Sequence, residues 1–429
     1  MGLEIFERGE LPRWAPMRQF LDATEIGDVR AAVAEQFRRP GVGDRLRPGQ
    51  RVAVTAGSRG IDRIDEVVRA VVDEVRKLGA VPFIVPAMGS HGGATAEGQI
   101  ELISHYGITE ETMGCPLLSS MDTVHLGEVE EHVPVWIDRN AFEADAVIPV
   151  GRVKPHTDFR GPVESGLMKM IAIGLGKQKG AEFFHSQGMG EFHHLIPAVA
   201  KFTLSQVNIP FGVAVIENGY GNLAQAEAVP AARVWEREQE LLKIARERMG
   251  RLPGDRIDVL IVDRIGKDIS GDGADPNVIN RDVAGVLPPT EEPVTPRIQR
   301  LIIRDLTDDT EGNASGIGMA DIVLRRAVDK MDPVATYMNM ITAKAPQGAR
   351  IPLTVDTDRE AIYVALACCL KTQQETARIA RIQDTKHLET FWASEHLLPE
   401  LLESGRVEVT GELRPIAFDA NGMLADEAT

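Results

Sequence analysis

The chain has 429 residues, 43% of them hydrophobic and 26% charged, and its formal net charge is −17 at pH 7. This length and composition are typical of a globular protein with two domains. The acidic balance argues against nucleic acid or an anionic membrane surface as the main partner, although a local basic site could bind a small anion. The three cysteines form no CxxC pair and the N-terminus is no signal peptide, so we expect a cytoplasmic protein.

Strands and helices are predicted to alternate along most of the chain, and each strand ends in a polar or glycine-rich loop. The predicted strands begin near Arg51, Val81, Ala144, Phe211 and Ile257. The predicted helices are Ile26–Phe37, Ile61–Gly79, Ala96–Tyr106 and Ala231–Met249. Repeated strand–loop–helix units predict a parallel sheet with helices on its faces.

The rest of the chain continues this pattern. Leu301–Leu306 is predicted to be a strand, Met319–Lys330 a helix, and a further helix ends at Leu370. We therefore predict an α/β fold with two α/β domains, 1–253 and 254–429, whose sheets are mainly parallel and flanked by helices.

Ligands bind beyond the carboxyl ends of the strands in open parallel sheets, so four strand-end loops could form one site. These loops are Gly57–Arg59, Gly89–Gly92, Arg152–Arg160 and Ile265–Asp268. Arg59 and Lys267 suit carboxylate recognition, the arginine through its fork and the lysine as a point charge. His91 and His156 titrate near neutral pH and could act as acid or base, or be ordinary polar loop residues. The residues alone indicate a site for a small anion.

One stretch, Lys154–His185, concentrates the unusual features of the sequence. Lys169 has apolar neighbours on both sides, and desolvating an ammonium group is costly and lowers its pKa. Either its stem reaches water or it is a functional amine. His185 follows two phenylalanines and could be a hydrogen-bonded core histidine or a metal ligand.

The order of these residues resembles the lactate racemase family, whose members use a nickel-pincer nucleotide. That family has an arginine after the first strand and a histidine in a glycine loop after the second. A second histidine after a proline, a lysine, and a third histidine sixteen residues later complete its pattern. The same order here is Arg59, His91, His156, Lys169 and His185, the last two being sixteen residues apart (185 − 169).

The resemblance implies a racemase or epimerase that inverts carbon 2 of a 2-hydroxyacid by hydride transfer to and from the cofactor. The cofactor, of the nickel pyridinium-3,5-bisthiocarboxylic acid mononucleotide type, would be attached covalently at Lys169, with His185 as the protein ligand to nickel. His91 and His156 would be the acid and base, and Arg59 would bind the substrate carboxylate. Lys154 and Lys267 would be further cofactor-binding residues.

The resemblance also implies how the two domains divide the work. Domain 1–253 would bind the cofactor and carry the catalysis, and domain 254–429 would close the active site in the cleft between them. The expected partners are a small 2-hydroxyacid, such as a sugar acid, and cofactor-maturation proteins. The segment RGPVESGLM before Lys169 and the pair Ala56-Gly57 depart from the family pattern.

Two other functions are weighed against this one. A zinc-dependent hydrolase would use His91, His156 and His185 as three metal ligands, although the sequence lacks a short His-x-x-x-His pair. A non-enzymatic anion-binding protein would need neither metal nor cofactor.

Overall fold

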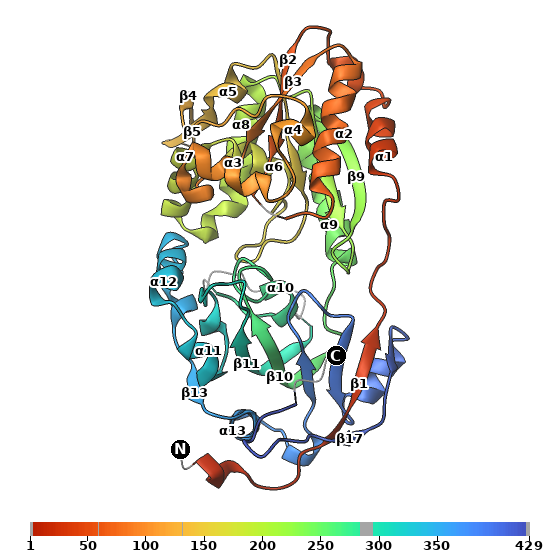
Figure 1. Ribbon diagram of the computed structural model, residues 1–429, viewed down its shortest axis with the longest axis vertical. Helices are drawn as coiled ribbons and strands as arrows, with labels where there is room; N and C mark the ends of the chain where they lie inside the picture. Colours follow the sequence, from red (N-terminus) through yellow and green to blue (C-terminus); the bar gives the residue numbers. More distant parts are fainter. Residues whose placement is uncertain (1–2, 59, 131, 284–294, 426–429) are drawn as a thin grey trace. The chain divides into compact units, whose positions relative to one another are not determined.

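The computed structural model describes residues 3–58, 60–130, 132–283 and 295–425 (Figure 1). The chain divides into two compact units. One unit is Ala23–Met249, and the other joins Met1–Asp22 to Gly250–Thr429. The mixed α/β fold with parallel strands flanked by helices is confirmed.

The unit Ala23–Met249 contains two three-stranded sheets, in the orders β3-β2-β6 and β7-β8-β9. The strands are β2 Arg51–Ala56, β3 Val81–Pro86, β6 Ala146–Ile148, β7 Val150–Arg152, β8 Phe211–Glu217 and β9 Leu223–Pro230. β2 is parallel to both β3 and β6, β7 is parallel to β8, and β9 is antiparallel to β8. The strand predicted to begin at Ala144 is divided at Pro149, because proline has no N–H to donate to a ladder.

Helices cover both faces of the sheet that contains β2. Val52 and Val54 of β2 pack in the same core as the buried valines of α1 (Val29–Phe37) and α2 (Ile64–Lys77). Ala53 between them faces the opposite core, since successive side chains of a strand alternate. That second core contains α7 (Lys177–Gln187), α8 (Phe192–Gln206) and α9 (Val234–Arg248). The shorter elements are α3 Ala96–Ser104, α4 Glu110–Met113, α5 Arg139–Phe142, α6 Leu167–Lys169 and the hairpin β4 Thr123–Val129 with β5 Val133–Asp138.

The other unit contains a nine-stranded sheet in the order β13-β12-β11-β10-β14-β15-β1-β16, with β17 paired to β1. Its strands are β1 Arg13–Gln19, β10 Arg256–Ile265, β11 Arg297–Leu306, β12 Ile322–Leu324, β13 Leu353–Val355, β14 Ile379–Ile382, β15 Thr390–Ser394, β16 Val407–Val409 and β17 Arg414–Pro415. The helices are α10 Pro276–Ile279, α11 Arg325–Asp329, α12 Pro333–Thr342, α13 Asp358–Cys368 and α14 Leu398–Glu403. The five strands from β13 to β14 are parallel to one another.

The structure differs from the sequence-based expectation at two places in this unit. The predicted division put residues 1–22 in the first domain, whereas β1 pairs antiparallel with β15 and β16. Its buried Trp14 explains this placement, because it packs in a core built from residues far along the chain. Met17 is also buried and pairs with Phe391 of β15. The helix predicted over Met319–Lys330 is wrong in its first part, where Ile322–Leu324 form strand β12, paired with β11 and β13.

Within the described ranges, no helix is both long and apolar enough to cross a membrane.

Candidate active site

Three of the predicted strand-end loops follow strands of the unit Ala23–Met249. They follow β2, β3 and β7. β2 and β3 are parallel neighbours, so their carboxyl ends lie at one edge of their sheet. The loop after β2 contacts the loop after β3, because Ser58 Oγ hydrogen bonds to His91 Nδ1. Tyr106 OH also donates to the carbonyl oxygen of Ser58, at 3.0 Å. Arg59, the predicted carboxylate-binding residue, lies outside the described residues.

His91 is exposed on a tight loop that packs against the segment following Lys169. Gly89 has a φ of +62°, which glycine adopts without strain, and a Cβ there would lie 3.0 Å from the Cβ of Ala181. The Gly89 N–H donates to the carbonyl oxygen of Gly174 at 3.1 Å. An exposed imidazole on a well-anchored loop is suited to proton transfer.

His156 lies on a loop whose two ends are joined. Lys154 and Ser165 exchange two backbone hydrogen bonds of 3.1 and 3.2 Å. The Asp158 N–H donates to His156 Nδ1 at 3.0 Å, so Nδ1 acts as an acceptor and the neutral ring carries its proton on Nε2. Arg160 donates to the carbonyl oxygen of His156 at 2.5 Å and so also holds this loop.

The buried carboxylate of Glu164 organises the inside of the same loop. Its Oε2 accepts from the backbone N–H of His156 at 2.6 Å, and its Oε1 accepts from Gly161 N–H at 3.1 Å. Arg246 of α9 donates to Oε1 at 2.6 Å and balances the charge. Glu164 belongs to the segment in which the sequence departs from the family pattern, and sequence reasoning gave it no role.

Lys169 ends the short helix α6 and is followed directly by a π-helical turn, Met170–Gly174. The Leu175 N–H donates to the carbonyl oxygen of Met170 at 2.9 Å, which is the i to i−5 bond of a π-turn, a feature frequent at functional sites. Leu167, Met168 and Ile171 are buried, whereas Lys169 is only half-buried. The helical turn explains the apparent conflict in the sequence, because it directs the apolar neighbours to the core and the lysine away from it.

Two aromatic rings link His156, Lys169 and His185. The ring of Phe159 lies 4.4 Å from that of His156, and the Lys169 Nζ atom lies 5.9 Å from the centre of the same ring. Phe192 packs against Phe159 at 5.5 Å and against the half-buried His185 of α7 at 5.7 Å. The structure therefore brings these three predicted residues together. The bond from Gly89 to Gly174 anchors the His91 loop to the turn that follows Lys169.

The remaining predicted cations are placed separately. Lys154 is half-buried at the base of the His156 loop. Lys267 follows β10 in the other unit, where its Nζ donates to the carbonyl oxygen of Gly271 at 2.6 Å.

The described residues contain no cluster of three or more His, Cys, Asp or Glu side chains that could hold a metal ion. The zinc-hydrolase alternative needs three histidines on one ion, so the geometry does not favour it.

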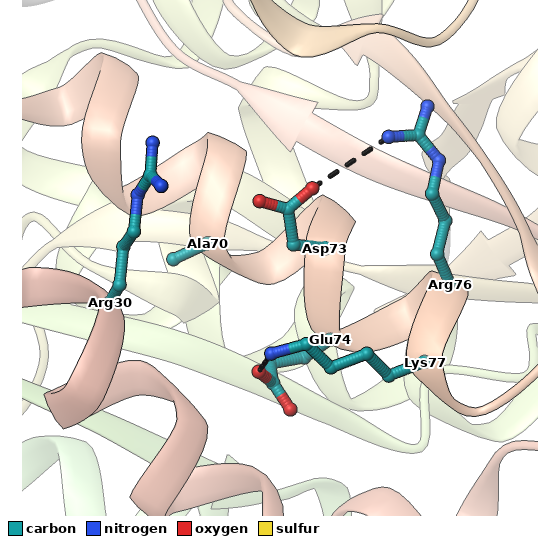
Figure 2. A pocket seen from close by; sticks show the side chains of 6 residues that line it. All are labelled: Arg30, Ala70, Asp73, Glu74, Arg76 and Lys77. Carbon is teal, nitrogen blue, oxygen red and sulfur yellow. Dashed lines mark hydrogen bonds and ion pairs between the residues drawn. The ribbon is translucent and has the colours of Figure 1, made fainter.

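The hollow drawn in Figure 2 is lined by residues of α1 and α2 and includes none of the predicted site residues. Its charged groups pair with one another: Asp73 lies 3.7 Å from Arg76, and Glu74 lies 2.6 Å from Lys77. We assign it no part in the chemistry.

Glu238 of α9 is a second carboxyl group that sequence reasoning missed. It is buried, and its Oε2 accepts from the backbone N–H of Met168, next to Lys169, at 2.9 Å. A Cβ at Gly166 would lie 2.5 Å from Glu238 Oε1, so glycine permits this close approach. Burial raises the pKa of Glu238 to about 7, and the backbone hydrogen bonds from Met168 and Leu167 oppose that rise.

This raised pKa predicts a pH-dependent contribution to stability. Because the folded-state pKa lies above the ordinary value of 4.5, the contribution is complete below pH 4.5 and is lost as the pH rises through about 7. As the pH rises from 4.5 to about 7, the free energy of unfolding of Glu238→Gln should increase relative to wild type, by roughly 3 kcal/mol in total. Urea unfolding on either side of this window measures the change, with Glu236→Gln, on the exposed side of α9, as the control. An equal effect of the two substitutions would contradict the prediction.

The chain thus has a mixed α/β fold, and the candidate histidines and Lys169 lie on loops and helices of the unit Ala23–Met249. A family model described as the lactate racemase N-terminal domain matches residues 16–193. This part of the chain is therefore similar to the N-terminal domain of lactate racemases.

Solved structures resemble this chain at low sequence identity. The lactate racemase apoprotein from Thermoanaerobacterium thermosaccharolyticum is 14% identical, with a TM-score of 0.55, and the match covers 85% of this chain and 93% of that one. A protein from Thermotoga maritima is also 14% identical, with a TM-score of 0.47, over 66% of this chain and 72% of that one. At such identity the first of these likenesses establishes the fold alone. No curated protein sequence matches the chain.

Proposed function

We propose that this protein is a racemase or epimerase that inverts carbon 2 of a 2-hydroxyacid with a nickel-pincer nucleotide attached at Lys169. The observation that carries the proposal is the grouping of His156, Lys169 and His185 around Phe159 and Phe192. All three lie in the part of the chain that matches the lactate racemase N-terminal domain, in that family's order.

The two loop histidines are assigned the proton transfers. The Nδ1 atom of His91 is engaged by Ser58, and that of His156 by the Asp158 N–H, so we assign Nε2 of each ring to the substrate. One imidazole takes the proton of the 2-hydroxyl group, and the other serves the opposite enantiomer, whose hydroxyl lies on the other side of carbon 2. Arg59 is assigned to the substrate carboxylate, for which its planar fork is suited.

The surroundings of Lys169 fit a covalently attached cofactor. The amine is half-buried at the start of a π-turn and lies over an aromatic ring, and His185 is linked to the same aromatic pair. A single imidazole alongside soft sulfur donors suits nickel. The described residues contain no cluster of three His, Cys, Asp or Glu side chains, and a nickel site with one protein ligand does not need one. When bound, the cofactor supplies a reversible hydride acceptor. Lys154 is assigned to the phosphate of the cofactor. Cofactor binding by Lys267 stays a prediction. A cleft between the two domains, a cytoplasmic location and the cofactor-maturation proteins as partners are also still predictions.

A panel of 2-hydroxyacids tests the proposal. The protein should be produced in a host that makes the cofactor and incubated with lactate, a larger aliphatic acid, an aromatic acid and a sugar acid. Inversion at carbon 2 is expected for at least one of them, by NMR for the sugar acid and by chiral chromatography for the others. Nickel-containing protein that inverts none of the panel would speak against the proposal.

A further inference from the structure

A buried polar chain lies behind the loop that carries His91. Lys177, the first residue of α7, is fully buried, and its Nζ atom has three oxygen partners. It donates to the Pro86 carbonyl at the end of β3 at 2.7 Å and to Gln99 Oε1 of α3 at 2.8 Å, and it lies 3.1 Å from Asp138 Oδ2.

Gln99 connects Lys177 to the His91 loop by hydrogen bonds. Its Nε2 donates to the carbonyl oxygen of Gly89 at 2.9 Å and to that of His91 at 3.2 Å. An amide side chain can present either its oxygen or its nitrogen to a partner. Because the Lys177 ammonium can only donate, Oε1 must face it, and the NH₂ group is left to face the loop.

The cost of burying the ammonium is offset by Asp138. This carboxylate is also fully buried, and its Oδ1 accepts from the Ala141 N–H at 2.9 Å, which caps α5. Burial lowers the pKa of Lys177 and raises that of Asp138, while their mutual attraction opposes both changes. Lys177 also has a φ of +53°, which is unfavourable for a side chain with a Cβ, so its surroundings hold it in place.

We propose that Lys177 and Gln99 are positioning residues for His91: they hold the catalytic loop against α7, the helix that also carries His185. The inference rests on the proposed acid–base role of His91. The backbone bond from Gly89 to Gly174 supports it, since it joins the same loop to the turn between Lys169 and α7.

The test uses variants that leave no unpaired buried charge. Lys177→Met combined with Asp138→Asn removes both charges and keeps an acceptor for the cap of α5. Gln99→Met removes the two donors to the loop and leaves the Lys177–Asp138 pair intact. Lys179→Met, an exposed position on the same helix, is the matched control.

The first readout is the titration of His91 by NMR in protein without cofactor, with the resonance assigned by its loss in His91→Gln. Both sets of variants should shift the His91 resonance and its midpoint, and Lys179→Met should not. The second readout is kcat for inversion, expected to fall about 10- to 100-fold with little change in KM, because the loop is misplaced but the other binding groups remain.

The readouts separate the two proposals. A His91 titration that is unchanged in both folded variants would overturn the positioning role, whatever the activity. A wild-type protein that inverts no substrate would overturn the proposed function, while the NMR comparison would still decide whether Lys177 and Gln99 hold the loop.

Discussion

Lys169→Arg is expected to abolish both cofactor attachment and inversion. The guanidinium keeps a positive charge that can stack on Phe159, so packing in this region should persist. The delocalised guanidinium cannot replace the lysine amine in the covalent link to the cofactor. Because the cofactor carries the difficult chemistry, turnover should fall to the uncatalysed background.

Mass spectrometry of the tryptic peptide that contains residue 169 measures the link directly. The wild-type peptide should carry a nucleotide adduct and the Lys169→Arg protein should carry none. Elemental analysis for nickel gives a second measurement. Lys179→Arg, at an exposed position of α7, should retain adduct, nickel and activity. Inversion that survives in Lys169→Arg would exclude this mechanism.

Replacing either loop histidine by glutamine is expected to lower kcat for inversion about 10²- to 10⁴-fold, the usual contribution of general acid–base catalysis. Glutamine can still hydrogen bond but cannot take up a proton at neutral pH. Both His91→Gln and His156→Gln should retain the adduct and the nickel, since neither residue is assigned to the cofactor. His185→Gln should instead lower the nickel content.

His194→Gln provides the control for these substitutions. His194 is partly exposed, and its ring nitrogens lie 3.4 Å from Glu130 and 3.5 Å from Glu191. Kinetics at saturating substrate and nickel analysis together distinguish the acid–base histidines, whose loss lowers kcat, from the nickel ligand, whose loss lowers the nickel content. The control should change neither. Unchanged kcat in His91→Gln would remove that residue from the proposed chemistry.

Local patterns in the sequence predicted most elements of the unit Ala23–Met249. Helix α2 was found from the spacing of its buried valines and a terminal glycine, and β3 from a continuous apolar run. The same approach failed at Ile322–Leu324, because a short apolar run fits a helix as well as a buried strand. β1 was misplaced because its partner β15 lies more than 370 residues away.

In the candidate site, too, some features could be predicted from the sequence and others could not. The loop positions of His91 and His156 follow from their place after predicted strands, since parallel strands bring their ends together. The supporting residues were not visible in the sequence: Glu164 meets Arg246 across 82 positions, and Met168 meets Glu238 across 70. Such pairs depend on how helices pack and leave no local pattern.

The sequence by itself determined the alternation of strands and helices, the polar loops at the strand ends and the family order of the site residues. These features depend on neighbouring residues and on short periods, which a single chain displays directly. Only the tertiary structure decided that Lys169 turns away from the core, that Phe159 and Phe192 join it to two histidines, and that Lys177 supports His91 through Gln99. The physical reason is that desolvation, aromatic packing and buried hydrogen bonds depend on distances in space between residues that are far apart in the chain.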